Sequence, residues 1–356
     1  MRNLSCWSAA ALLFLSACGG DKPATTGTTP AEHNATTDGQ GAKPAAKGPE
    51  KPVRLEMPMI QALFGADPSS PKVDNPSTPE KVALGRMLYH EQSLSKNGNM
   101  SCASCHDLAN YGQDGKKTSP GSDGTLGERN TPTTWNAFRQ FAQFWDYRAK
   151  TVEDQAIMPV LNPIEHGVAD EAALITKIKA KPELVEGFKK AFGDGDVVSV
   201  PNFKLAVGAF ERTLVTKSRF DDFLDGNDHA LTNAEKKGLK TFIDVGCNTC
   251  HMSRLVGGSM PQTLGVKAPY PSEDIGRAKV TGEDKDKFLF KVPSLLNVEK
   301  TAPYNHDGRY DKLEDAVANM AKIQLDKTLS ADEIASIVTF LKTLTGQLPA
   351  DIVSAR

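Results

Sequence analysis

The motif C-x-x-C-H occurs twice in the chain, as Cys102-Ala-Ser-Cys105-His106 and as Cys247-Asn-Thr-Cys250-His251. This is the pattern to which a c-type haem is covalently attached. In each copy the two thiols can add to the haem vinyl groups, and the adjacent histidine offers a neutral imidazole nitrogen to the iron. The sequence therefore predicts two haem c groups in one chain. What binds the other side of each iron decides the function.

Zinc binding and thiol redox chemistry are the alternative interpretations of each C-x-x-C pair. A four-cysteine zinc site would require the two pairs to fold together. Thioredoxin-like chemistry needs no histidine at the same offset in both copies. Repetition of the whole five-residue motif therefore favours haem attachment over both alternatives.

The N-terminus is typical of an exported protein. Arg2 precedes an apolar stretch, residues 6–15, that is too short to span a bilayer. Residues 1–17 are predicted to be a lipoprotein signal peptide, because Leu15-Ser16-Ala17-Cys18-Gly19 resembles a bacterial lipobox. Cys18 would then be acylated, which predicts a periplasm-facing lipoprotein held at a bacterial membrane only by its lipid anchor. Cleavage of an ordinary signal peptide nearby, without lipidation, stays open.

The composition of the rest of the chain limits the choice of fold and partner. Of the six cysteines, Cys6 lies in the signal peptide, Cys18 at the anchor and four in the haem motifs, so none remains for a structural disulfide. Residues 18–53 are rich in Gly, Pro, Thr and Ala and are predicted to be a disordered tether. The part that follows is longer than one hydrophobic core usually organises. The formal net charge of -2 gives no basic field for nucleic acid.

Helix signals dominate the sequence after the tether. Thr78-Pro79 and the capping box Thr232-x-x-Glu235 each begin a helix ahead of one haem motif. A second capping box, Ser330-x-x-Glu333, and the apolar stripe 203–214 predict further helices. The expected fold class is mainly α, with a helix-then-haem unit used twice.

Ordered landmarks between Pro79 and Leu344 resemble the bacterial di-haem cytochrome c peroxidases and their relatives of the methylamine-utilisation MauG type. The landmarks in the first half are Leu84-Gly85-Arg86, Arg129-Asn130-Thr131-Pro132, Trp145-Asp146, Gln155 and Leu161-Asn162-Pro163-Ile164-Glu165. Those in the second half are Asp274-Ile275-Gly276-Arg277, Phe290-Lys291-Val292-Pro293-Ser294-Leu295 and Pro303-Tyr304-Asn305-His306-Asp307-Gly308.

The resemblance implies two cytochrome c-like haem domains in tandem. We expect a peroxidatic N-terminal domain at residues 54–215, an electron-transfer domain at residues 216–345 and a tail at residues 346–356. The N-terminal haem would meet peroxide and the C-terminal haem would receive electrons from a donor protein. Relatives are often homodimers, and this is expected here only by resemblance.

For the N-terminal haem, the resemblance implies that His106 is the proximal iron ligand. Glu165 occupies the position of the family's catalytic glutamate, and Gln155 matches a glutamine of the same pocket. Trp145 matches a tryptophan that similar proteins place between the haems. From the residues alone, Glu165 after a proline turn is typical of a surface residue and Trp145 of a core residue.

For the C-terminal haem, the resemblance implies His251 and Met320 as the two iron ligands. A thioether ligand favours ferrous iron and raises the reduction potential, as an electron store requires. Met260 is a competitor for that position, and spacing alone makes Met320 part of a helical core stripe. His306 is expected to hydrogen-bond a haem propionate rather than the iron.

A calcium site is also implied by the resemblance. Asn130 and the backbone carbonyl groups of Thr301 and Pro303 match the family's interdomain site, whose oxygen ligands suit a hard cation. The sequence contains no EF-hand loop to support this site independently.

The chain departs from the family pattern at several positions. Relatives that need reductive activation carry a histidine in the loop after the first haem motif, but no histidine lies between His106 and His166, and Ser122 stands in that loop. We therefore hypothesise that the N-terminal iron is open in the fully oxidised protein. His166 stands where Met is usual, as a substitute cap, a second acid–base group or a structural residue. Tyr147, Asn305 and Leu296 replace a usual Gly, Phe and Arg.

The sequence thus predicts a cytochrome c peroxidase that reduces hydrogen peroxide to water with electrons from a small cytochrome c or a cupredoxin. One alternative is a MauG-like enzyme that oxidises side chains of a partner protein. Such relatives typically have Tyr where Met320 stands, which favours the peroxidase. A second alternative is a non-catalytic di-haem electron carrier.

Overall fold

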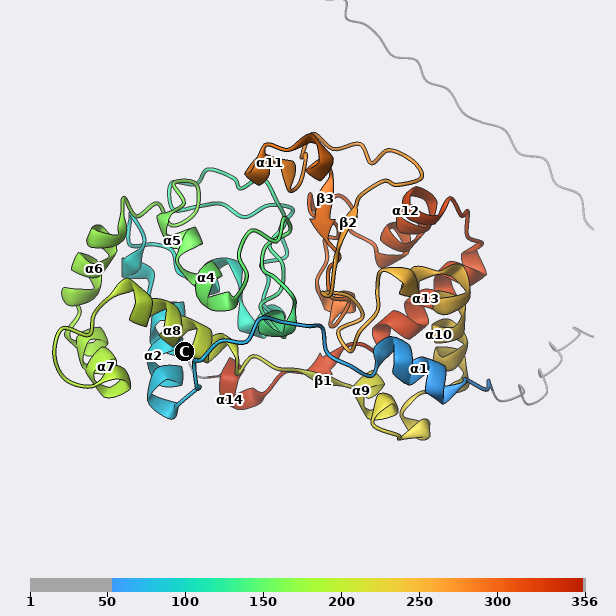
Figure 1. The fold of residues 1–356 in the computed structure, drawn as a ribbon, viewed down its shortest axis with the longest axis horizontal. Helices are drawn as coiled ribbons and strands as arrows, with labels where there is room; N and C mark the ends of the chain where they lie inside the picture. The colour runs from blue at the N-terminus through green and yellow to red at the C-terminus, as the bar shows by residue number, and fades with distance from the viewer. Residues whose placement is uncertain (1–52, 355–356) are drawn as a thin grey trace, which may run out of the picture. The chain divides into compact units, whose positions relative to one another are not determined.

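The computed structural model describes residues 53–354, which are mainly helical (Figure 1). The signal peptide and tether predicted from the sequence, with Cys6, Cys18 and His33, lie outside the described residues. In the first half the α-helices are α1 (Met57–Phe64), α2 (Pro79–His90), α3 (Cys102–Cys105), α4 (Val152–Ala156), α5 (Met158–Leu161), α6 (Glu171–Lys179), α7 (Pro182–Phe192) and α8 (Val200–Glu211). In the second half they are α9 (Arg219–Leu224), α10 (Asn233–Val245), α11 (Ala278–Thr281), α12 (Leu313–Leu325), α13 (Ala331–Lys342) and α14 (Ala350–Val353).

Strands make a small contribution to residues 53–354. Strand β1 (Lys217–Ser218) pairs antiparallel with β4 (Gly346–Gln347). Strand β2 (Pro261–Thr263) pairs antiparallel with β3 (Leu289–Lys291). The mainly α fold class expected from the sequence is confirmed, and none of the helices in residues 53–354 has the length and apolarity needed to span a bilayer.

The predicted helix starts are confirmed by their capping contacts. The Thr78 side chain accepts a hydrogen bond from the Lys81 backbone at the start of α2. Thr232 with Glu235, and Ser330 with Glu333, form the two expected capping boxes of α10 and α13. Such caps satisfy backbone N–H groups that have no partner inside the helix.

One helix pair organises each half of the described chain. Helix α2 packs against α8 and α7, and its buried Leu84 and Leu88 join a core cluster with Leu174, Phe188 and Phe203. In the second half α10 packs against α13, and the cluster there contains Leu239, Phe242, Ile337 and Phe340. Figure 1 shows the first helix group and the second on either side of a central region of loops that includes β2 and β3.

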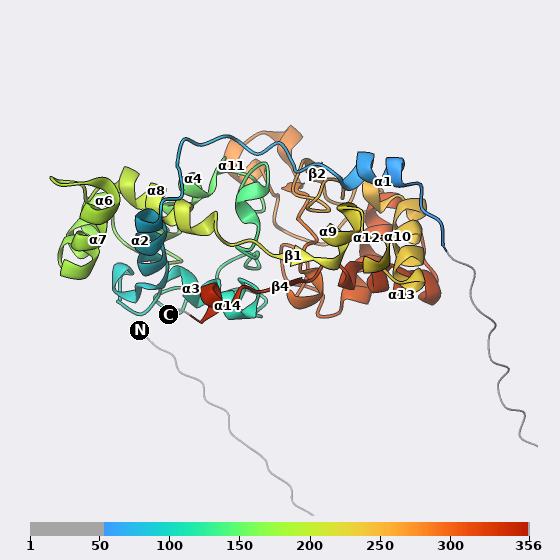
Figure 2. The same cartoon turned by 90° about the horizontal axis from the view of Figure 1, so that it is seen from below.

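Both ends of the described chain pack with the opposite half. Ile60 and Phe64 of α1 are fully buried in the cluster around Phe220 and Phe340. Residues 346–356, expected to be a tail, include α14, whose Ile352 packs in a cluster with Tyr89, Leu108 and Trp135. In Figure 2, α1 lies beside α9 and α10, and α14 lies beside α3.

Candidate functional site

The first haem motif lines a cavity of about 400 Å³. The motif sits on α3 and the residue that follows it, while the other walls come from loop 119–134, segment 143–148 and residues 155–166. Cys102, Cys105 and His106 line this cavity, which we call the first cavity, together with Gln155, Glu165 and His166. Residues up to 180 positions apart in the sequence, from Met100 to Val280, line this one cavity.

Hydrogen bonds hold the first motif in place. The Tyr89 hydroxyl donates to the backbone carbonyl of His106 at 2.8 Å. The Nδ1 atom of His106 lies 3.2 Å from the carbonyl oxygen of Gly112. This contact fixes the tautomer, with the proton on Nδ1, and leaves Nε2 with its lone pair for a metal. Burial lowers the pKa of His106, which also keeps the imidazole neutral.

Two of the motif thiols, those of Cys102 and Cys247, are poorly suited to thiol redox chemistry. Burial raises the pKa of Cys102 and of Cys247 to about 12, whereas a reactive cysteine needs a lowered pKa. The four motif cysteines are free of disulfide bonds. Within residues 53–354 no cluster of three or more His, Cys, Asp or Glu side chains could hold a metal ion such as zinc. Both alternatives to haem attachment are therefore disfavoured.

The second motif lines another cavity, of about 270 Å³, which we call the second cavity. The Nδ1 atom of His251 lies 3.2 Å from the carbonyl oxygen of Val256, the same arrangement as at His106. Burial lowers the pKa of His251 to about 4. Met320, on α12, lines the second cavity, whereas Met252 and Met260 are absent from its walls in the described part of the chain.

The residues of both cavities fit a haem c group. Each cavity presents two free thiols in the C-x-x-C spacing and a neutral imidazole whose Nδ1 is already bonded. The second cavity adds a thioether in Met320, while the first adds a carboxyl and an amide in Glu165 and Gln155. The two donor sets are therefore unequal, as an electron-storing site and a reacting site would require.

Glu165 lies in the wall of the first cavity. The Nδ2 atom of Asn162 donates to Oε1 of Glu165 at 2.8 Å, which orients the carboxyl group. Burial raises the pKa of Glu165, although the Asn162 hydrogen bond and the charge of Arg148 act in the opposite direction. A carboxyl group with a raised pKa accepts a proton more readily than an ordinary glutamate.

Loop 119–124, which contains Ser122, is hydrogen-bonded to the segment that bears Glu165. The Ser122 backbone N–H donates to the Glu165 carbonyl oxygen at 2.8 Å, and the Ser122 hydroxyl donates to Oδ1 of Asn99 at 2.8 Å. A side chain at Gly121 would place its Cβ 1.6 Å from the Ile164 carbonyl oxygen, so only glycine allows this approach. Among the described residues, Ser122 is not part of the first cavity wall.

Trp145 lines both cavities. Its indole N–H donates to the Asn130 carbonyl oxygen at 2.9 Å, and its own carbonyl oxygen accepts from the Lys291 backbone at 2.7 Å. The Lys291 ammonium is buried and donates to the Ala142 carbonyl oxygen at 2.9 Å. Burial lowers the pKa of Lys291 to about 7, with Asp146 acting in the opposite direction. The tryptophan is thus held by backbone contacts to both halves of the chain.

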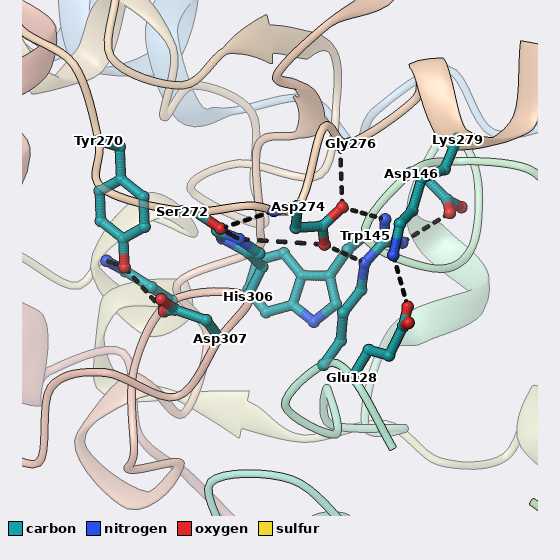
Figure 3. A network of polar contacts seen from close by, with 12 residues as sticks. Glu128, Trp145, Asp146, Tyr270, Ser272, Asp274, Gly276, Lys279, His306 and Asp307 are labelled. Carbon is teal, nitrogen blue, oxygen red and sulfur yellow. Dashed lines mark hydrogen bonds and ion pairs between the residues drawn. The ribbon is translucent and has the colours of Figure 1, made fainter. Parts of the chain in front are cut away.

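A polar network connects the two halves next to Trp145 (Figure 3). Arg129 donates from Nε and Nη2 to Asp274 at 2.6 and 3.0 Å, and from Nη1 to Asp146 at 2.6 Å. Asp274 also accepts from the Gly276 backbone at 2.9 Å. These interactions keep the pKa of Asp274 low although burial acts to raise it. The Arg129–Asp274 pair therefore fixes the loop after Glu128 against the loop that contains Asp274, and the Arg129–Asp146 pair holds it to the segment after Trp145.

His306 belongs to the same network and lines the second cavity. Its Nε2 lies 3.2 Å from the Ser272 hydroxyl, and its ring lies 4.4 Å from the Phe290 ring. The ring of Trp145 is 6.3 Å away, at 71° to it. Burial lowers the pKa of His306, so the ring is a neutral hydrogen-bonding group.

The residues expected at a calcium site lie around one cavity. Asn130, Thr301 and Pro303 all line the second cavity. The Asn130 amide nitrogen donates to the Lys116 carbonyl oxygen at 2.9 Å, which leaves the amide oxygen as the available ligand atom. Oxygen atoms of this kind suit calcium.

Three residues that depart from the family pattern make defined contacts in the structure. The Arg277 guanidinium lies over the Tyr147 ring, 4.7 Å from its centroid. The Tyr147 ring also packs against Phe141. The Asn305 amide donates to the Tyr270 hydroxyl at 3.1 Å. Leu296 is buried in the core cluster of the second half. Each replacement is accommodated by its own contacts.

Sequence analysis missed three residues of the two cavities and the network. Glu211 lines the first cavity, and burial, with Glu153 adding to it, raises the pKa of Glu211 to about 8. Its place in the apolar stripe of α8 was the only signal, since a charged residue among buried positions needs an explanation. Lys291 and Arg129 were part of quoted landmarks, but nothing local in the sequence indicated their partners.

Comparison with known proteins decides the family. Residues 79–229 match the model of the family described as di-haem cytochrome c peroxidase. Cytochrome c551 peroxidase of Nitrosomonas europaea is 43% identical over 282 residues, which cover 78% of this chain and 84% of that protein. The chain belongs to the di-haem cytochrome c peroxidase family. Family membership implies two haem c groups, in agreement with the donors of both cavities.

Other relatives extend across the family. Cytochrome c551 peroxidase of Pseudomonas aeruginosa is 41% identical over 281 residues, covering 77% of this chain and 81% of that protein. Methylamine utilization protein MauG of Methylophilus methylotrophus is 31% identical over 290 residues, covering 77% and 85%. Among solved structures, a MauG-like protein associated with microbial copper homeostasis matches with a TM-score of 0.70 at 29% identity, covering 80% of this chain and 95% of that chain.

Proposed function

We propose that this member of the family, an oxidoreductase that acts on peroxide, is a cytochrome c peroxidase that takes its electrons from a small cytochrome c or a cupredoxin. The observation that carries the proposal is the placement of Glu165 in the wall of the same cavity as His106. An acid–base group beside the position available to substrate is what peroxide reduction requires. The overall reaction is H₂O₂ + 2 e⁻ + 2 H⁺ → 2 H₂O.

The residues that would hold the cofactors follow from the cavity walls. Cys102 and Cys105 would attach the first haem, with His106 as its iron ligand. Cys247 and Cys250 would attach the second, with His251 and Met320 as ligands. When bound, the haems supply the electron transfer that cleaves the O–O bond.

The side chains of the first cavity handle the protons. Glu165 would accept a proton from one oxygen of a peroxide molecule held in the first cavity, and would return it to the oxygen that departs as water. The Asn162 hydrogen bond keeps the carboxyl group turned for this exchange. Its raised pKa makes the Glu165 carboxylate a better proton acceptor than an ordinary glutamate. Gln155 can hydrogen-bond the substrate from the same wall.

The second cavity supports the role of electron entry. A Met320 thioether raises the reduction potential of the group that His251 would ligate. Trp145, in contact with both cavities, lies where electrons must cross between them. We propose that it assists this transfer.

The competing functions have weaker support. MauG-like relatives that oxidise a partner protein typically have Tyr at the position of Met320, and here the thioether lines the cavity with His251. A pure electron carrier needs no acid–base group in the first cavity, and the Glu165 carboxyl is such a group.

The absence of reductive activation stays part of the proposal. Ser122, in the loop where relatives carry the activating histidine, is hydrogen-bonded to Asn99 rather than lining the first cavity of the described chain. We propose that the first iron is open in the fully oxidised protein. Low-spin six-coordinate signals from both haems in that state would contradict this.

The remaining proposals concern binding partners and location. Calcium bound by Asn130, Thr301 and Pro303, a lipid anchor at Cys18, a periplasm-facing position and a homodimer rest on the sequence and on resemblance to the family. The electron donor is expected to be a small redox protein that approaches the second cavity.

The test is a stopped-flow measurement with haem-loaded protein, a pre-reduced small cytochrome c and hydrogen peroxide. Glu165→Gln should lower turnover about 10²- to 10⁴-fold, because the amide cannot exchange the proton. The exposed Glu283 provides the control, Glu283→Gln, which should turn over like the parent protein. Unchanged turnover in Glu165→Gln would remove the proposed acid–base role. No turnover by the parent, whether fully oxidised or half-reduced with ascorbate, would refute the peroxidase.

A further inference from the structure

His166 is a buried histidine in a fixed stretch of backbone. Only 6% of it is exposed. Its backbone N–H donates to the Pro159 carbonyl oxygen at 3.2 Å, and its carbonyl oxygen accepts from the Lys96 backbone at 2.8 Å. Both contacts hold the main chain, so the direction of the side chain is set by the fold.

The imidazole of His166 lacks the partner that other buried histidines have. The Nδ1 atoms of His106 and His251 each lie 3.2 Å from a backbone carbonyl oxygen. Nδ1 of His166 is fully buried and has no hydrogen-bond partner within residues 53–354. Leaving a buried polar atom unpaired is unfavourable, so such a group in a folded protein calls for an explanation.

The polar groups nearest in the sequence are already engaged. Glu165 accepts the Asn162 amide at its side chain and the Ser122 N–H at its carbonyl oxygen. The Ser122 hydroxyl is taken by Asn99. His166 lines the first cavity together with His106 and Glu165. Because Nδ1 is enclosed and has no acceptor among the residues that the structure describes, the ring proton is better placed on Nε2, the ring nitrogen that can reach the content of this cavity.

The protonation state of His166 suits hydrogen bonding to a small neutral ligand. Burial first, and the nearby His106 second, lower the pKa of His166 to about 4. The ring is therefore neutral in the working range and carries one N–H donor and one lone pair. It can bind an oxygen ligand without placing a second charge beside Glu165.

We propose that His166 is a second catalytic residue, which hydrogen-bonds the peroxide held in the first cavity, beside Glu165. The inference rests on the proposed peroxidase function and adds a residue to it. Glu165 exchanges the proton, while the His166 N–H holds the oxygen atom that the carboxyl group does not. His166 makes no covalent bond and undergoes no net change of protonation.

The experiment measures ligand binding instead of turnover. Fluoride is added to fully oxidised, haem-loaded protein and followed by absorption, because bound fluoride accepts hydrogen bonds from neighbouring donors. His166→Met removes the donor but keeps a similar volume, and His166→Gln retains an N–H. The control is His229→Met, the same change at an exposed position.

We expect His166→Met to weaken fluoride binding about three- to tenfold, the range for loss of one hydrogen bond. His166→Gln should recover part of the affinity, and His229→Met should bind like the parent. The electron paramagnetic resonance spectrum of the oxidised parent should keep a high-spin signal that no variant changes.

Three results would overturn the inference. These are equal fluoride affinity in His166→Met and the parent, no fluoride binding by the parent, and a low-spin signal of the parent that becomes high-spin in His166→Met. The last would make His166 an iron ligand. Fluoride binding that depends on His166 in a protein that does not turn over peroxide supports the hydrogen bond and refutes the peroxidase, so the two failures are distinguishable.

Discussion

Gly85 of α2 lies directly against the backbone of α8. A Cβ added at Gly85 would be 2.0 Å from the Ala206 carbonyl oxygen and 2.7 Å from Cβ of Phe210. Gly238 of α10 meets α13 in the same way, with 2.1 Å to the Ser336 carbonyl oxygen and 2.9 Å to Cβ of Phe340. Each half therefore has one helix crossing that only glycine permits.

The cost of Gly85→Ala follows from this geometry. Ordinary van der Waals contact begins at 3.4 Å, and the new Cβ would lie 2.0 Å from the Ala206 carbonyl oxygen. Because this oxygen belongs to the backbone of α8 and cannot rotate away, α2 would have to move by about 1.4 Å. Overpacking of this kind costs about 1–3 kcal/mol, and the gap opened along the helix pair loses further dispersion energy. Alanine has a higher helix propensity than glycine, which offsets this cost by up to about 1 kcal/mol. We expect a net loss of about 2 kcal/mol in the free energy of unfolding.

The assay is thermal unfolding of haem-loaded protein, combined with hydrogen exchange read by mass spectrometry. A loss of about 2 kcal/mol should lower the melting temperature by about 4–8 °C. In Gly85→Ala the faster exchange should be confined to α2, α7 and α8, and in Gly238→Ala to α10 and α13, if the chain divides near residue 216 as predicted.

The control is Gly187→Ala in α7, where the new Cβ would meet only the flexible end of Leu84 at 3.0 Å. It should be within about 1 kcal/mol of the parent. The packing argument is refuted if Gly85→Ala is as stable as Gly187→Ala. Exchange that rises equally across both helix pairs in either variant would refute the division into two domains.

Two further predictions concern buried carboxyl groups. Because the pKa of Glu211 is raised to about 8, its contribution to stability is complete below the ordinary glutamate pKa and is lost as the pH rises towards 8. Glu211→Gln should therefore gain stability relative to the parent by up to about 1.4 kcal/mol per pH unit between pH 5 and 8, and parallel stability curves would contradict this. Glu153 accepts two hydrogen bonds from Arg212 at 2.9 Å each and one from Asn75 at 3.1 Å, so Glu153→Gln should cost about 3 kcal/mol in denaturant unfolding. The control Asp154→Asn, which breaks a half-exposed pair with Lys204, should cost less than about 1 kcal/mol, and equal losses would refute the role of burial.

Local signals in the sequence were enough for the helix starts and the haem motifs. Thr78, the box Thr232-x-x-Glu235 and the box Ser330-x-x-Glu333 act within one helical turn, so their effect does not depend on the rest of the fold. The two motifs likewise carry their own spacing. These features could be predicted because every partner is a few residues away.

The position of Glu165 in a cavity wall could not be predicted from the residues next to it in the sequence. From the residues alone it was expected at the surface, and only resemblance to the family placed it in a pocket. Its half-burial depends on loop 119–124, which approaches closely through Gly121 and is fastened by Ser122. Such an approach between segments distant in the sequence leaves no periodic pattern to be recognised.

The network beside Trp145 was beyond sequence reasoning for a related cause. Arg129 and Asp274 are 145 positions apart, and each would pass for a surface charge in a loop. Lys291 follows an apolar residue in β3, but its burial results from loops of the other half. Long-range charge pairing is decided by tertiary packing, which residue spacing does not encode.

The exchange of chain ends between the halves has a consequence for biogenesis. Neither half can close its core from consecutive residues, since Phe64 completes the cluster around Phe340 and Ile352 completes the cluster around Trp135. During synthesis α1 is made before the second half of the chain, so it lacks its packing partners until that half has been made. The cluster behind the first haem motif, in turn, needs Ile352 of α14, which follows the second half. The surroundings of both haem motifs therefore depend on segments from both halves of the described chain.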